Sequence, residues 1–197
     1  MDRAAAVPLG HTILDAVAAT RRVVRSNANL GIVLALAPLA AARTPGPVRA
    51  ADAAAVLDRL TADDARLVWE AIAIARPGGM GGSDKWDVGG PAPSDLMEAM
   101  RLAAPRDAIA RLWAEGYAPL FAGPVPDLAA ELAAGFCLDD AIVRCHLRQL
   151  ARTPDTLIAR RHGAAVARVN PGTTADLVAA ALYILLADGT LQPHLGS

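Results

Sequence analysis

The chain has 197 residues and a formal net charge of −1 at pH 7, so it lacks the broad basic surface that attracts nucleic acid. Hydrophobic residues make up 54% of the chain, much of it alanine, whereas aromatic residues make up only 4%. This composition favours helices that pack closely through small side chains. We therefore expect an all-α fold, a single-domain multi-helix bundle over residues 1–197, and no nucleic-acid partner.

The cysteines and the most apolar segments indicate whether the protein contains a disulfide bond or a membrane span. Cys137 and Cys145 lie eight residues apart in a segment expected to be helical, which separates them by about 12 Å and excludes a disulfide bond. The apolar stretches Leu30–Ala42 and Ala175–Ala187 are shorter than the roughly 20 residues that span a membrane. We expect both stretches to be central buried helices, and the protein to be cytoplasmic without membrane contact.

Apolar residues at helical spacing predict the elements of the first half of the chain. A helix is expected from Thr12, as its N-cap, to Arg25, and a very apolar helix is expected from Leu30, kinked or ended near Pro38. After a turn, two helices with carboxylates near their starts are expected over Ala51–Leu60 and Asp63–Arg76.

A glycine-rich stretch separates these helices from those of the second half. There the pattern predicts helices over Ser94–Ala103, Arg106–Glu115, Pro124–Ala134, Phe136–Arg152 and Asp155–Val169, and a final apolar helix that ends at Asp188.

The predicted helix over Phe136–Arg152 carries two groups of reactive or charged side chains. Asp140 and Arg144 have the i, i+4 spacing that favours an ion pair on one helix face. Cys145 and His146 are neighbours and therefore point about 100° apart on a helix, which argues against a zinc site.

Polar residues near the predicted starts of two apolar helices are candidates for ligand binding. Asn27 and Asn29 come just before Leu30, where an asparagine amide either caps the helix or contacts a ligand at its positive end. Asn170–Asp176, which includes Gly172 and Thr173, combines a rigid turn with a hydroxyl N-cap and an acidic residue in the first turn. A plain helix start explains this second pattern equally well.

The glycine-rich loop over residues 78–90 offers unhindered backbone N–H groups, including those of Gly79 and Gly81. Lys85 adds a cation, and Asp87 adds a carboxylate that suits a metal ion. The loop lacks the spacing of a P-loop, and no strand is expected before it, so a surface loop and a phosphate cradle both remain open.

Arg160 and Arg161 form the densest cluster of hydrogen-bond donors in the chain. Guanidinium groups bind phosphates through two parallel hydrogen bonds, although adjacent arginines also commonly serve only to solvate a helix face.

Four segments, taken in order, resemble one family: NANLGIVLALAPLAAA, ARPGGMGGSDKWDVGG, PDTLIARRHG and NPGTTADLVAAALYILL. They are similar to the triphosphoribosyl-dephospho-CoA synthase family, in its short bacterial and archaeal branch. The likeness extends from about Thr12 to Gly189, and the order of several motifs makes it more specific than any one motif.

The resemblance implies an all-helical transferase that moves the 5-triphosphoribosyl group of ATP to dephospho-CoA or a related acceptor and releases adenine. Mg²⁺ would accompany ATP, with Asp87 as its protein ligand. Arg161 stands where the family more often has lysine. Together with the loop, the resemblance assigns to the nucleotide pocket Asn27, Asn29, Gly31, Gly79, Gly81, Lys85, Arg160, Arg161, Asn170, Gly172, Thr173 and Asp176.

One family feature does not appear in this sequence. Members usually open with a segment that carries Lys-Pro-Gly-Asn, so we expect the 197-residue chain alone to bind ATP–Mg²⁺ weakly and to release adenine slowly or not at all. A second polypeptide, or another copy in a homo-oligomer, would then supply the missing groups. The alternative is a non-catalytic nucleotide-binding or assembly subunit, linked to tetrahydromethanopterin-dependent one-carbon metabolism.

Overall fold

The computed structural model describes residues 7–24, 29–42, 46–75, 91–152 and 172–192. All regular structure in these ranges is helical, which confirms the all-α fold. The helices are α2 (Leu9–Val23), α3 (Leu30–Ala41), α4 (Ala50–Leu57), α5 (Ala62–Ala75), α6 (Leu96–Ala103), α7 (Ala108–Ala114), α8 (Ala118–Ala122), α9 (Pro124–Ala133), α10 (Leu138–Arg152) and α12 (Gly172–Ala187).

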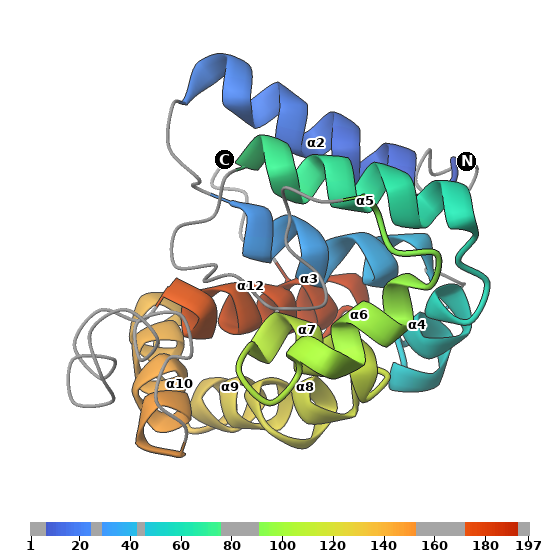
Figure 1. Ribbon diagram of the computed structural model, residues 1–197. Helices are drawn as coiled ribbons and strands as arrows, with labels where there is room; N and C mark the ends of the chain where they lie inside the picture. Colours follow the sequence, from blue (N-terminus) through green and yellow to red (C-terminus); the bar gives the residue numbers. More distant parts are fainter. Residues whose placement is uncertain (1–6, 25–28, 43–45, 76–90, 153–171, 193–197) are drawn as a thin grey trace.

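The apolar helices α3 and α12 lie in the middle of the described fold. In Figure 1, α2 and α5 run side by side along one edge, and α8, α9 and α10 form the opposite edge. Helix α3 packs against α2 and α12, and α12 in turn packs against α9 and α10. The central position expected for both apolar helices is therefore confirmed.

The burial of α3 and α12 explains why they can be so apolar. Leu34 and Leu39 of α3, and Ala181 and Ile184 of α12, are buried in the hydrophobic core. The residues expected to be mostly buried were Ile32, Val33, Leu36, Leu177, Ala181 and Ile184. Ala181 and Ile184 are buried, whereas Ile32, Val33, Leu36 and Leu177 are only partly buried. Within the described ranges, no helix is long and apolar enough to cross a membrane.

The first helix begins earlier than the sequence predicts, because a residue distant in the sequence accepts a hydrogen bond from a backbone N–H of its first turn. Helix α2 starts at Leu9, not after an N-cap at Thr12, and the N–H of Gly10 donates to Oδ1 of Asp64 on α5 at 2.8 Å. Burial raises the pKa of Asp64, but hydrogen bonds from Gly10 and Thr61 outweigh it and hold that pKa below its usual value. The carboxylate therefore stays charged and fastens α2 to α5.

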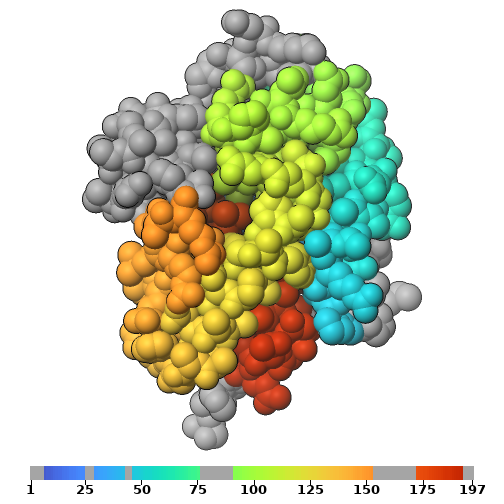
Figure 2. Space-filling view, turned by 90° about the horizontal axis from the view of Figure 1, so that it is seen from below, coloured from blue at the N-terminus to red at the C-terminus, as the bar shows by residue number. Residues whose placement is uncertain are grey.

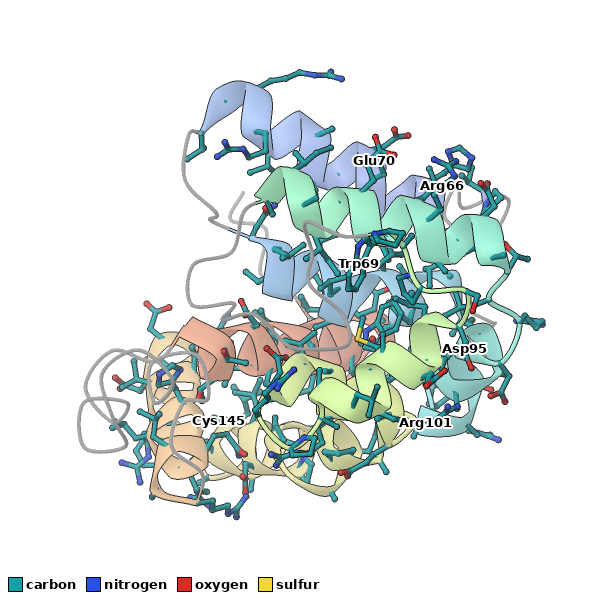
Figure 3. All side chains as sticks on the ribbon, in the orientation of Figure 1. Arg66, Trp69, Glu70, Asp95, Arg101 and Cys145 are labelled. Atoms are coloured by element: carbon teal, nitrogen blue, oxygen red, sulfur yellow. The ribbon has the colours of Figure 1, made fainter. Side chains whose placement is uncertain are left out.

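Helix α5 separates a core face from a solvent face, as Figure 3 shows for three labelled residues. Trp69 is 9% exposed and belongs to the core cluster. Arg66 lies on the outer face and pairs with Asp63 at 2.8 Å and with Glu70 at 3.5 Å. Exposed pairs of this kind contribute only a few tenths of a kcal/mol, so burial of the inner face holds the helix in place.

Pro38 lies inside α3, which continues for three more residues and ends at Ala41, close to the proline as expected. A proline has no N–H, so the carbonyl of Leu34 four residues earlier loses its helical donor. A buried side chain replaces it: Trp113 Nε1 donates to the Leu34 oxygen at 2.9 Å. The Tyr117 hydroxyl lies 2.9 Å from the Ala35 oxygen and 3.3 Å from that of Leu34, so its single proton is directed mainly to Ala35. Helix α7 thus stabilises the central helix α3 at the carbonyl that Pro38 leaves without a helical donor.

We expect Trp113→Phe to lower the free energy of unfolding by about 1–3 kcal/mol, because a buried carbonyl loses its better donor. In a Pro38→Ala background the same change should cost less, since residue 38 then supplies a helical N–H to Leu34. Urea unfolding of the four chains of this cycle measures the difference. Equal costs in both backgrounds would mean that Trp113 does not act through the Leu34 carbonyl.

Candidate functional site

Many of the predicted site residues fall outside the described residues. The glycine-rich loop and the arginine pair are among them, and the set comprises Asn27, Gly79, Gly81, Lys85, Asp87, Arg160, Arg161 and Asn170. The candidates that the structure places are Asn29, Gly31, Gly172, Thr173 and Asp176.

The structure brings two of these candidates, Gly31 and Asp176, into direct contact. A Cβ atom on Gly31 would lie 1.9 Å from Oδ2 of Asp176, so the carboxylate occupies the space that any other side chain at residue 31 would need. Gly31 lies in the first turn of α3 and Asp176 near the start of α12, and these two helices pack together. The absence of a side chain at residue 31 therefore lets a charged group sit against the start of α3.

Asn29 occupies the N-cap position of α3, but its side chain makes no capping hydrogen bond. Its Nδ2 instead donates to the Thr20 hydroxyl of α2 at 2.8 Å. The capping interpretation is therefore wrong for Asn29. This hydrogen bond fixes the amide between α2 and α3, beside the contact of Gly31 with Asp176.

The start of α12 differs from the helix start expected from the sequence. Gly172 is its first residue, and Thr173 and Thr174 lie inside the first turn, where they are 7% and 6% exposed. Neither is an N-cap. The Thr173 hydroxyl makes no hydrogen bond to any residue that the structure describes, which is unusual for a polar group so deeply buried.

Thr173 lines a cavity of about 350 Å³ whose walls come from α7, α8, α10, α12 and the first residue of α9. In Figure 2, red atoms of α12 are visible at the bottom of a hollow bordered by orange α10, lime α7 and yellow α8. The residues that line the cavity are Ala108, Arg111, Leu112, Pro119, Leu120, Ala122, Gly123, Pro124, Gln149, Arg152, Thr173, Thr174 and Leu177. Thr173 and Thr174 in the first turn of α12 thus form a wall of this cavity. Asp176, expected in the first turn, lies just beyond it and contacts α3.

A buried carboxylate on α9 holds two of the cavity side chains in place. Asp127 is 7% exposed and accepts hydrogen bonds from both terminal nitrogens of Arg152 and from Nε2 of Gln149. Bidentate pairing fixes the plane of a guanidinium group. Arg152 therefore reaches the cavity with a defined orientation, although about half of its side chain is exposed.

The ion pair expected between Asp140 and Arg144 does not form. Arg144 instead donates to Glu131 of α9 at 2.7 Å and lies over the ring of Phe136, and Arg148 also bonds to Glu131. The reason is energetic, since an exposed i, i+4 pair is worth only a few tenths of a kcal/mol. An unpaired buried carboxylate is far more costly, and the Glu131 side chain is only 4% exposed.

The pairing of Glu131 predicts how stability depends on pH. The hydrogen bond from Arg144, opposed by burial and aided by the charges of Arg144 and Arg148, lowers the pKa of Glu131 below its usual value. A lowered pKa stabilises the fold above the unfolded value, and this contribution is lost as the pH falls through the folded value. We expect Glu131→Gln to be less stable than the wild type at pH 7 but to lose less stability between pH 6 and about pH 3. Thermal unfolding across this range tests it, and parallel curves would contradict it.

The cysteines and acidic residues do not assemble into a metal site in the described part of the chain, where no three candidate ligands come together. Both cysteines are free, Cys137 at the surface and Cys145 in the core. Burial, with a smaller effect of the Asp127 charge, raises the pKa of Cys145 to about 11, so its thiol stays protonated at neutral pH.

Sequence reasoning missed the cavity residues Arg111, Gln149 and Arg152. A signal for part of the cluster was present: Arg144, Arg148 and Arg152 repeat every four residues and face the similarly spaced Asp127 and Glu131. The pairing of these two helix faces, and the approach of Arg111 from α7, depend on tertiary packing that local spacing does not encode.

Comparisons with known proteins agree with the resemblance. Residues 1–169 match the family described as CitG: ATP:dephospho-CoA triphosphoribosyl transferase. A crystal structure from Archaeoglobus fulgidus, proposed to be a triphosphoribosyl-dephospho-CoA synthase, has a similar fold with a TM-score of 0.69 and 22% identity, covering 91% of this chain and 89% of that one. No curated protein gives a significant match. Because the family match spans most of its length, the chain belongs to the ATP:dephospho-CoA triphosphoribosyl transferase family.

Proposed function

We propose that this protein transfers the 5-triphosphoribosyl group of ATP to dephospho-CoA in a site built around the N-terminal parts of α3 and α12. The contact between Gly31 and the Asp176 carboxylate carries the proposal. It joins two motifs far apart in the sequence, and Thr173, three residues before Asp176 on α12, lines the cavity.

The reaction exchanges one bond at the ribose of ATP for another. A hydroxyl oxygen of the acceptor bonds to the ribose carbon that carries adenine, the bond between that carbon and adenine breaks, and the hydroxyl proton leaves with adenine or to solvent. Positive charge develops on the ribose during such a displacement. A carboxylate held near the reacting carbon favours this charge, and Asp176 is the described carboxylate at the start of α12.

Mg²⁺ is proposed to accompany ATP. Mg²⁺ in nucleotide sites is usually bound through one or two carboxylates together with substrate phosphates, so this site needs few protein ligands. Asp176 provides a carboxylate suited to this role, and Asp87 remains the ligand proposed from the family resemblance. The bound ion would neutralise phosphate charge and orient the triphosphate, while arginines supply the remaining donors.

Adenine release tests the proposed transfer. The purified chain is incubated with ATP and Mg²⁺, with and without dephospho-CoA, and adenine is separated by chromatography. Any adenine should appear only when both substrates are present, and its rate also tests the expectation that the isolated chain turns over slowly or not at all. Calorimetric binding of ATP–Mg²⁺ without any adenine release would instead favour the non-catalytic binding subunit.

A further inference from the structure

The cavity beside α12 lies against a network with more positive than negative side chains. Asp127 and Glu131 are buried carboxylates, and three guanidinium groups from α10 surround them: Arg144, Arg148 and Arg152. The network therefore carries one net positive charge, and its member Arg152 lines the cavity together with Arg111 of α7. None of the described residues that line the cavity is acidic. This distribution of charge favours an anionic ligand.

The donors at the cavity are only partly used by the protein. Arg152 bonds to Asp127 through one N–H of each terminal nitrogen, which leaves three of its five N–H groups without a partner in the described structure. Among the described residues Arg111 bonds only through Nε, which donates to the Ala104 carbonyl oxygen at 3.3 Å, and neither of its terminal nitrogens has a described partner. The buried Thr173 hydroxyl adds a third donor without a described partner.

The type of these donors matches phosphate better than other anions. Planar guanidinium groups match the spacing of two phosphate oxygens, and hydroxyl groups in the first turn of a helix commonly bind the same group. Helix α12 has 16 residues and presents its positive end at the cavity through Thr173 and Thr174. The volume of about 350 Å³ lies at the lower end of the roughly 300–1,000 Å³ of ligand sites, which suits one compact part of a larger substrate.

We propose that this cavity binds the polyphosphate group of a substrate, with Arg111 and Arg152 as charged contacts and Thr173 as a hydroxyl contact. Asp127 acts as a positioning residue, because it orients both Arg152 and Gln149. The choice of substrate rests on the proposed function, in which both ATP and dephospho-CoA carry a polyphosphate group.

Calorimetry with inorganic tripolyphosphate tests the site without relying on turnover. We expect Arg111→Ala and Arg152→Ala each to weaken binding by at least about tenfold, since a charge-assisted hydrogen bond is worth that much or more. Arg144→Ala is the matched control, because Arg144 lies on the same helix and pairs with a buried carboxylate but does not line the cavity. Equal affinities for all four chains, or no binding by the wild type, would overturn the proposal.

Thr173→Val separates binding from folding. Its hydroxyl makes no hydrogen bond in the described protein, so valine should leave the melting temperature unchanged or raise it while tripolyphosphate binds several-fold more weakly. A lower melting temperature with unchanged binding would assign Thr173 a purely structural role and contradict its part in the proposal.

Titrations with ATP–Mg²⁺ and with dephospho-CoA identify the source of the polyphosphate. The substrate whose affinity falls in Arg111→Ala and Arg152→Ala, but not in Arg144→Ala, is the one that occupies the cavity. If neither substrate shows this pattern, the proposal fails even if tripolyphosphate binds. Binding of ATP through these arginines without adenine release would contradict the proposed transfer and leave the polyphosphate site standing.

Discussion

Replacing Gly31 by alanine is expected to lower adenine release by about 100-fold relative to the unmodified chain, while the fold is retained. The new Cβ would lie 1.9 Å from Oδ2 and 2.6 Å from Cγ of Asp176, so the carboxylate must move away from the start of α3. The displaced group is the end of a flexible side chain, and alanine is a better helix former than glycine. Stability should therefore change by less than about 1 kcal/mol.

Two measurements check this expectation together. Adenine release reports the site, and urea unfolding reports the fold of the same preparation. Asp176→Asn keeps the shape of the side chain but removes its charge, and it should also lower the rate. Full activity of Gly31→Ala would contradict the assignment of the Gly31–Asp176 contact to the site.

Replacing Gly10 by alanine should have the opposite pattern, with a large loss of stability and no specific loss of function. A Cβ at residue 10 would lie 2.8 Å from the Asp64 Cα and 3.0 Å from the Leu67 Cβ, so α2 must move away from α5. The displaced atoms include backbone, so the cost should reach about 3 kcal/mol, at the upper end of typical overpacking.

Thermal unfolding followed by circular dichroism measures this cost. For a chain of this size, about 3 kcal/mol corresponds to a fall in melting temperature of roughly 6–12 °C. Adenine release per folded molecule should stay close to that of the wild type, because Gly10 lies outside the site. A wild-type melting temperature would show that the close approach of α2 and α5 is not needed for stability.

Local sequence patterns predicted most helices well, because apolar spacing and N-cap residues lie within the helix itself or directly beside it. Asp95 and Asp107 each accept two backbone N–H groups at the starts of α6 and α7, close to the predicted boundaries. Local patterns were insufficient where tertiary contacts replaced local ones. Asp64, which lies on another helix, accepts the N–H of Gly10 at the start of α2, and Trp113 donates to the Leu34 carbonyl that Pro38 leaves without a donor.

The candidate site was predictable only in part, for a similar reason. The resemblance placed Gly31 and Asp176 in one pocket, and the structure brings them into contact, although their roles remain predictions. The cavity beside them combines Arg111 and Arg152, which belong to none of the motifs and meet only through packing of α7, α10 and α12. Spacing along one helix cannot reveal such a combination.

The most direct test of the proposed transfer is the stoichiometry of its products. Mass spectrometry of a reaction with ATP, Mg²⁺ and dephospho-CoA should show that the acceptor gains one triphosphoribosyl group for every adenine released. The Asp176→Asn chain should form both products more slowly in the same ratio. Adenine without the modified acceptor, or loss of phosphate from ATP in place of adenine, would contradict a triphosphoribosyl transfer by this chain.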